Sequence, residues 1–157
     1  MDLHAFLTQH ADAIVGHATD AIATRKLKSY LKVGTEISRG KLRALFDRVV
    51  EGVQTHRLDP VVEHAERVGK ERYESGFEFV EVQSAFNLLE EAIWNEMLAE
   101  YPAQEMGVAL GMVATLLGAA KDRLACTYLS LATHAHVGTL DLQSLFRGTQ
   151  NTGGGQS

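Results

Sequence analysis

The stretch FEFVEVQSAFNLLEEAIWNEMLAEYP, residues 77–102, decides the fold class. Its apolar side chains recur every three or four residues, along the stripe Val82, Phe86, Leu89, Ile93 and Met97. This spacing is the period of a helix and not the alternation of a strand. Pro102 then interrupts the pattern, as expected of a residue that cannot continue a helix. The pattern predicts an amphipathic helix from about residue 78 to residue 100.

Four further helices are expected on both sides of this segment. Residues 3–21 carry a stripe spaced alternately by four and three, formed by Leu3, Leu7, His10, Ile14, His17 and Ala21. Residues 38–53 have a broad apolar face, and Asp59 followed by Pro60 is typical of a helix start. Residues 103–133 are apolar nearly all round at first, which favours the centre of a bundle.

The length of 157 residues suits one globular domain. We therefore predict an all-α, single-domain antiparallel bundle of about five helices over residues 1–135, with a globin-like arrangement as an alternative. From residue 148 onward the chain contains only small and polar residues, including three consecutive glycines. Residues 136–157 are accordingly expected to be a flexible C-terminal segment or the start of a linker.

Charge is distributed unevenly along the sequence. Residues 25–43 carry seven Lys and Arg residues against one Glu, whereas residues 78–105 carry seven Glu residues and no base. The formal net charge of −5 argues against nucleic-acid binding, which depends on cations that neutralise phosphates. The two charged segments are interpreted either as solvated helix faces or as docking surfaces for a charged partner.

Several features favour a cytoplasmic protein. The single cysteine, Cys126, cannot form an internal disulfide, and the N-terminus lacks the pattern of a secretion signal. The most apolar stretch, residues 106–120, is shorter than the roughly 20 residues that span a bilayer. We expect no membrane insertion.

The seven histidines do not have the spacing of a metal site. His10 and His17 are seven residues apart, about 10.5 Å along a helix, too far for two ligands of one ion. No nucleophile with a base, no paired catalytic carboxylates and no phosphate-binding loop were found, so no enzymatic activity is expected. No cofactor is predicted, although haem needs only one axial histidine and stays as an alternative.

Two further patterns predict helix packing, one formed by small residues and one that contains histidines. Gly107 and Gly111 would let a neighbouring helix approach closely, either within the bundle or across a symmetric dimer. The stripe of Leu7, His10, Ile14 and His17 keeps a seven-residue repeat typical of a coiled-coil seam, and it is the preferred candidate for a homodimer interface. Its histidines are interpreted as neutral packing residues or as a pH-sensitive contact.

The sequence between the third and fourth predicted helices contains a distinctive junction. Gly76 is expected to end a helix in the left-handed conformation, and Phe77 to pack against the start of the next helix. Arg72 shares a stripe with apolar residues, so we expect it to be partly buried with Glu90 or Glu91 as its partner.

This junction and the helix that follows it resemble the N-terminal domain of RsbT co-antagonist proteins of the RsbRD type. The resemblance covers most of residues 1–135. It is carried by Arg72, Gly76, Phe77, Leu88, Leu89, Ile93 and Trp94.

The resemblance implies a non-catalytic sensory or oligomerising module of bacterial stress signalling. Its partners would be other signalling proteins or a downstream output domain. The alternative function is a small-ligand sensor that binds haem or another apolar molecule between its helices.

Overall fold

The computed structural model describes residues 1–139 of the chain. These residues form seven α-helices and one short 3₁₀ helix. The elements are α1 (Leu3–Gln9), α2 (Ala11–Arg25), α3 (Lys28–Val33), α4 (Thr35–Thr55), α5 (Asp59–Glu74), α6 (Phe79–Glu100), η1 (Ala103–Glu105) and α7 (Met106–Thr139). No strand occurs within this range, so the predicted all-α helical bundle is confirmed.

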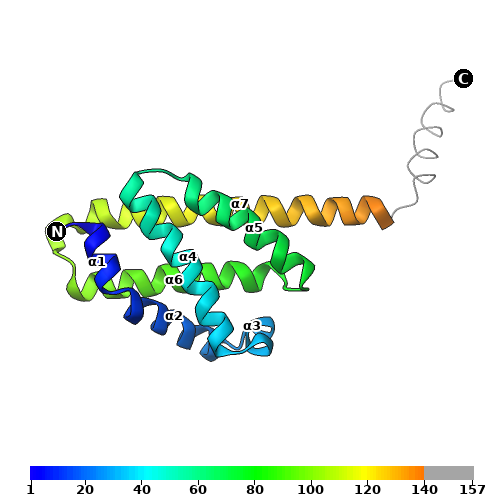
Figure 1. Cartoon of the computed structure of the whole chain (residues 1–157), viewed down its shortest axis with the longest axis horizontal. Helices are drawn as coiled ribbons and strands as arrows, with labels where there is room; N and C mark the ends of the chain where they lie inside the picture. The colour runs from blue at the N-terminus through cyan, green and yellow to red at the C-terminus, as the bar shows by residue number, and fades with distance from the viewer. Residues whose placement is uncertain (140–157) are drawn as a thin grey trace, which may run out of the picture.

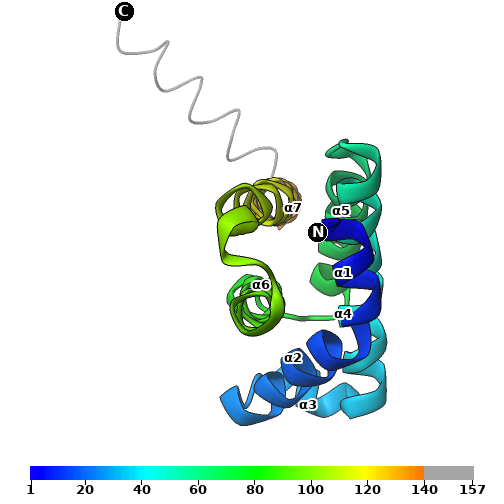
Figure 2. The ribbon, with the colours of Figure 1, turned by 90° about the vertical axis from the view of Figure 1, so that its left-hand side faces the viewer.

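The helices pack in two layers around one core. Helices α6 and α7 run antiparallel to each other and form one layer. Helices α1, α4 and α5 form the second layer, which faces the first (Figure 1 and Figure 2). Helix α2 packs along α6 and α4, and α3 closes one corner of the molecule. Helix α7 makes its most extensive contacts with α5.

There are more helices than the sequence pattern predicted because one expected helix is divided and one short helix is additional. The expected helix over residues 3–21 bends at His10, which ends α1 and precedes α2 with φ of −99° and ψ of 9°. The polar stretch before the next helix contains the short helix α3. The globin-like arrangement remains a prediction.

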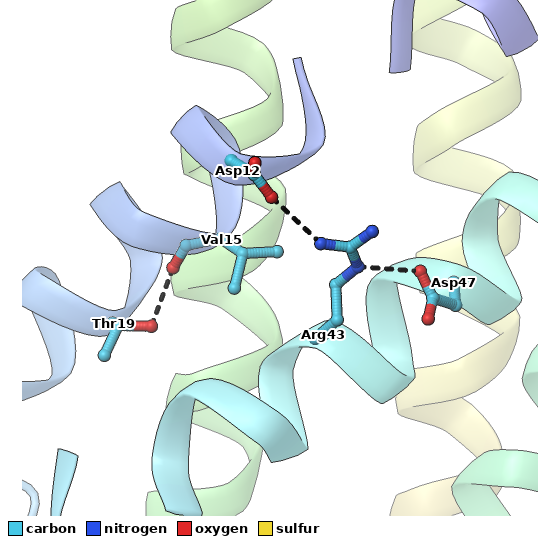
Figure 3. Close-up of polar contacts among 5 residues, drawn as sticks. All are labelled: Asp12, Val15, Thr19, Arg43 and Asp47. Atoms are coloured by element: carbon cyan, nitrogen blue, oxygen red, sulfur yellow. Dashed lines mark hydrogen bonds and ion pairs between the residues drawn. The ribbon is translucent and has the colours of Figure 1, made fainter. Parts of the chain in front are cut away.

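Polar contacts also join α2 to α4. Arg43 of α4 donates through Nη1 to Asp12 of α2 at 3.1 Å and through Nε to Asp47 at 3.0 Å (Figure 3). These groups are solvent-exposed, so the ion pairs contribute little net stability. In the same region the buried Thr19 hydroxyl donates to the Val15 carbonyl at 2.7 Å, which satisfies it within its own helix.

Helix α7 was expected at the centre of the bundle, and this prediction is wrong. One side of α7 packs on α5 and α6, but Val108 is 79% exposed and Leu129 is 69% exposed. The segment Ala103–His134 is long and apolar enough to cross a membrane, and 28% of its most apolar window is buried. Core helices of soluble proteins meet the same length and composition criterion.

The boundary expected at residue 135 falls inside α7, which continues to Thr139. The predicted flexible segment, residues 136–157, therefore begins within a helix. Its remainder, residues 140–157, lies outside the described residues.

The closest helix contacts occur at glycines that the sequence pattern did not single out. A Cβ atom on Gly52 of α4 would lie 2.5 Å from Leu116 Cδ2, and one on Gly69 of α5 would lie 2.8 Å from Thr127 Cγ2. Both contacted residues belong to α7. The glycines that allow close packing are thus on the helices opposite α7, and not on α7 itself.

The substitution Gly69→Ala tests this contact. In an exposed helix, replacing Gly by Ala stabilises by up to about 1 kcal/mol. At Gly69 the new methyl group meets the stiff β-branched Thr127, so we expect a net destabilisation of about 1–3 kcal/mol. The control is Gly16→Ala, because a Cβ atom on Gly16 of α2 meets nothing within 4 Å. Urea unfolding that shows stabilisation by both substitutions would contradict the close contact.

Candidate functional site

The end of α5 is a Schellman motif built from residues 72–77. The Phe77 amide donates to the Arg72 carbonyl at 2.9 Å, and the Gly76 amide donates to the Tyr73 carbonyl at 3.1 Å. Gly76 has φ of +84°, in the left-handed region that glycine adopts without a steric penalty. The predicted left-handed helix end at Gly76 is confirmed.

Arg72 lies under this turn and is 4% exposed, as its position on the apolar stripe predicted. Its Nη1 donates to Glu71 Oε1 at 2.5 Å, and its guanidinium carbon lies 5.8 Å from the centroid of the Phe77 ring. The buried Nε has no hydrogen-bond partner among residues 1–139. An ion pair and a cation–π contact therefore hold the guanidinium.

The expected pairing of Arg72 with Glu90 or Glu91 is wrong. Glu90 accepts from Lys121 of α7 at 2.7 Å, and Glu91 is exposed. The reason is distance along α6: Glu90 lies about 16 Å from the first residue of α6, at 1.5 Å per residue, whereas Arg72 contacts Phe77, which precedes that helix.

Phe77 is where four helices meet. Its ring packs edge-on against Tyr30 of α3, with centroids 4.9 Å apart, and its carbonyl accepts a hydrogen bond of 2.8 Å from the buried Tyr128 hydroxyl of α7. The Tyr128 ring lies 5.6 Å from the rings of both Tyr73 and Phe79. Burial raises the pKa of Tyr128 to about 12, so its hydroxyl remains a donor at neutral pH.

A buried carboxylate joins α3 to the start of α6. Glu81 is 8% exposed and accepts hydrogen bonds from the Ser29 amide at 2.8 Å, the Ser29 hydroxyl at 2.6 Å and the Glu78 amide at 3.1 Å. Burial raises the pKa of Glu81, but these bonds outweigh it and the net shift is downward. The ionised Glu81 side chain thus links α3 to α6 through hydrogen bonds.

We call these residues the Phe77 cluster. They are Ser29, Tyr30, Arg72, Tyr73, Phe77, Phe79, Glu81 and Tyr128. Only Arg72 and Phe77 were among the site residues predicted from the sequence. A glutamate three residues after Glu78 at a helix start was a detectable capping signal, whereas the contacts of Tyr30 and Tyr128 are non-local and left no signal in the sequence.

Helix α7 leaves the bundle at this cluster. It continues beyond the turn between α5 and α6 and projects from the molecule (Figure 1). Tyr128 is buried, whereas Leu129, Ser130 and residues 132–134 are exposed. The cluster therefore holds the base of a projecting helix.

The histidine stripe does not form a free seam, contrary to the predicted dimer interface. Leu7 and Ile14 are completely buried in the chain's own core. His10 stacks on Phe6 at 4.1 Å, and its Nδ1 lies 2.7 Å from Glu96 Oε1. Only His17 is exposed. A stripe that the bundle already buries is not available to a second copy.

Gly107 and Gly111 also differ from the prediction of close packing within the bundle. A Cβ atom on either glycine would meet nothing within 4 Å, and both residues are exposed. Gly111 lines a groove that it shares with Gly52 of α4 and with Leu58. The alternative that Gly107 and Gly111 face a second copy remains a prediction.

Trp94 is on the uncovered side of α6 and is 41% exposed. Leu98, one turn further along, is 64% exposed. We call this surface the outer α6–α7 face. It comprises Trp94 and Leu98 of α6, whereas Val108 and Gly111 of α7 line grooves between α7 and α4.

One groove is a candidate site for the small-ligand alternative. It lies where α1, the end of α4 and the start of α7 meet, and its lining includes His4, Val53, His56, Tyr101 and Met112. No three His, Cys, Asp or Glu side chains among residues 1–134 are placed to hold a metal ion. The residues of the groove are mixed in polarity, and none of them singles out a ligand.

The substitution Tyr128→Phe tests the link between α7 and the turn. It leaves the buried Phe77 carbonyl without a donor, which costs about 1–3 kcal/mol of stability, and it should increase amide hydrogen exchange in the last turns of α7. Tyr73→Phe is the control, because no hydrogen bond of the Tyr73 hydroxyl occurs within residues 1–139 and its removal should change stability by less than about 0.5 kcal/mol. Equal effects of both substitutions would refute the role of this bond.

His64 of α5 predicts how the stability of the fold depends on pH. Burial and the nearby Arg67, Arg48 and Arg72 lower the pKa of His64 from 6.5 to about 4. Between these pH values the unfolded chain binds a proton that the folded chain does not, so stability should fall as pH decreases from 6.5 towards 4.

The matched variants are His64→Gln and His17→Gln. Replacing His64 should remove about 1–2 kcal/mol of the acid-induced loss of stability, because its ring is partly solvated. Replacing the exposed His17 should leave the loss unchanged. Urea unfolding at several pH values measures both, and the same pH dependence in all three proteins would exclude a neutral, half-buried His64.

Comparison with known proteins gives one family. The family model described as the RsbT co-antagonist protein rsbRD N-terminal domain matches residues 5–139, which include the Phe77 cluster and the outer α6–α7 face. No match was found among the curated proteins or among the solved structures. Because the match covers most of the chain, this protein belongs to the family of RsbT co-antagonist rsbRD N-terminal domains, a signalling input family.

Proposed function

We propose that this chain is a non-catalytic, cytoplasmic signalling input module that works as a homodimer and passes its signal through α7 to other signalling proteins or an output domain. The observation that carries the proposal is the projection of α7 from a bundle whose outer α6–α7 face is apolar and uncovered. Family membership supports a stress-signalling role.

The outer α6–α7 face has the composition of a dimer interface. Trp94 is the kind of large aromatic residue that often dominates binding energy, and Leu98, one turn away, is apolar. Gly107 of α7 is exposed and has no side chain, so a second helix could approach the backbone there. In a symmetric dimer the same patch meets itself, so both copies of α7 would project from one interface.

The Phe77 cluster supports transmission through α7. It ties the base of α7 to α3, α5 and α6 through one buried hydrogen bond and several ring contacts. A rearrangement of those helices would therefore change how α7 leaves the bundle. A dimer that is biased between two arrangements of α7 is a simple physical form of such a relay.

Sedimentation velocity tests the dimer. The wild-type protein should form a dimer, Trp94→Ala should weaken it about tenfold or more, and Leu98→Glu should dissociate it, because each dimer would bury two unpaired carboxylates. Ile37→Glu is the matched control, since Ile37 is 54% exposed but lies on α4, away from this face. It should leave the dimer intact.

A wild-type protein that is monomeric at every concentration would refute the dimer. The same conclusion follows if Leu98→Glu and Ile37→Glu behave alike. Either result would favour the ligand-sensor alternative, with the groove between α1, α4 and α7 as its site.

A further inference from the structure

The basic residues that cluster in the sequence also lie together on the surface, at one corner of the molecule. The end of α2, the whole of α3 and the start of α4 meet there (Figure 2). Most cations elsewhere in residues 1–139 are matched by acids: Lys41 pairs with Glu71, and Lys121 pairs with Glu90.

The cations at this corner are different. Four of them within eight consecutive residues are exposed and have no carboxylate within ion-pair distance among residues 1–139: Arg25, Lys26, Lys28 and Lys32. Beyond this group, only Arg67 and Arg123 of the described Lys and Arg residues are equally unpaired. The corner is therefore a concentrated positive patch on an otherwise acidic protein.

Apolar side chains accompany these cations. Leu31 is 49% exposed on α3 between Lys28 and Lys32, and Ile37 is 54% exposed in the first turns of α4. Both apolar groups are therefore available, together with the cations, to a partner surface.

We propose that this basic corner, defined as Arg25, Lys26, Lys28, Leu31, Lys32 and Ile37, adsorbs to an anionic lipid bilayer. A cluster of four or more Lys and Arg residues beside exposed apolar side chains matches the physical requirements of such a surface. Leu31 would enter the headgroup region while the lysines contact lipid phosphates.

A bilayer fits the corner better than an acidic protein does. The patch lies at one end of the fold around a six-residue helix, whereas a stable protein interface buries about 800 Å² on each partner. Three of the four cations are Lys, which is depleted in protein interfaces, and the patch has no exposed aromatic residue. Lysine acts as a point charge and needs no precise geometry of its anionic partner.

This inference is independent of the proposed dimer, because the basic corner and the outer α6–α7 face share no residue. Each can fail without the other. Adsorption through the corner also needs no helix to cross the bilayer.

Vesicle co-sedimentation with the full chain tests the proposal. The protein should bind vesicles of phosphatidylglycerol mixed with phosphatidylcholine, and should not bind phosphatidylcholine alone. Binding should fall at least tenfold between about 0.05 M and about 0.5 M NaCl, because salt screens attraction between exposed charges.

Two sets of variants locate the binding surface. Lys26→Glu combined with Lys32→Glu should reduce binding at least tenfold, and the milder Lys32→Gln and Leu31→Ser should each reduce it measurably with an unchanged circular dichroism spectrum. The control combines Arg67→Glu with Arg123→Glu, which changes the net charge equally but alters α5 and α7. It should retain most of the binding.

Several results would overturn the proposal. These are no binding to the anionic vesicles at low salt, and an equal loss of binding in the corner variant and the control. Salt-sensitive binding to soluble poly-glutamate without binding to vesicles would assign the corner to an acidic protein instead.

Discussion

The carbonyl of Phe77 is the point on which the arrangement of the later helices depends. Gly76, with φ of +84°, turns the chain so sharply that only four residues separate the end of α5 from the start of α6. The turn leaves the Phe77 carbonyl inside the bundle, where an unpaired acceptor would be costly. Tyr128 supplies the donor from α7, 51 residues away in sequence. One turn conformation thereby fixes both the course of the chain from α5 into α6 and the position at which α7 leaves the bundle.

Much of this could be predicted from sequence because it depends on local chemistry. Helical periodicity predicted the buried face of α6, and a glycine after a helical stripe predicted the left-handed turn. The burial of Arg72 followed from its stripe as well. Its partner did not, because a stripe specifies which side of a helix faces inward but not which residue of a neighbour lies opposite. The nearest acid was Glu71, beside it in the sequence, and not a residue of the facing helix.

The glycines show the same limit more clearly. Gly107 and Gly111 carry the small-residue spacing that suggests close packing, yet both face outward. Gly52 and Gly69 carry no such pattern, yet their missing side chains make room for Leu116 and Thr127 of α7. Helix propensity disfavours all four residues alike. The assembled bundle determines which side of a helix its neighbour occupies. An amphipathic pattern would have indicated that side in the sequence, but α7 is apolar on nearly every side and has no such pattern.

The basic corner adjoins the Phe77 cluster through α3. Ser29 belongs to α3, the helix at the basic corner, and its amide and hydroxyl both donate to the buried Glu81 at the start of α6. Two residues before α6, Phe77 accepts the hydrogen bond of Tyr128 and so contacts the base of α7. A bilayer bound at α3 could change the direction of α7 only if it binds two arrangements of this cluster with different affinities. The ionised Glu81 makes such a difference physically reasonable, because separating α3 from α6 would leave a buried carboxylate without its two Ser29 donors, and that cost would be borne by one arrangement alone.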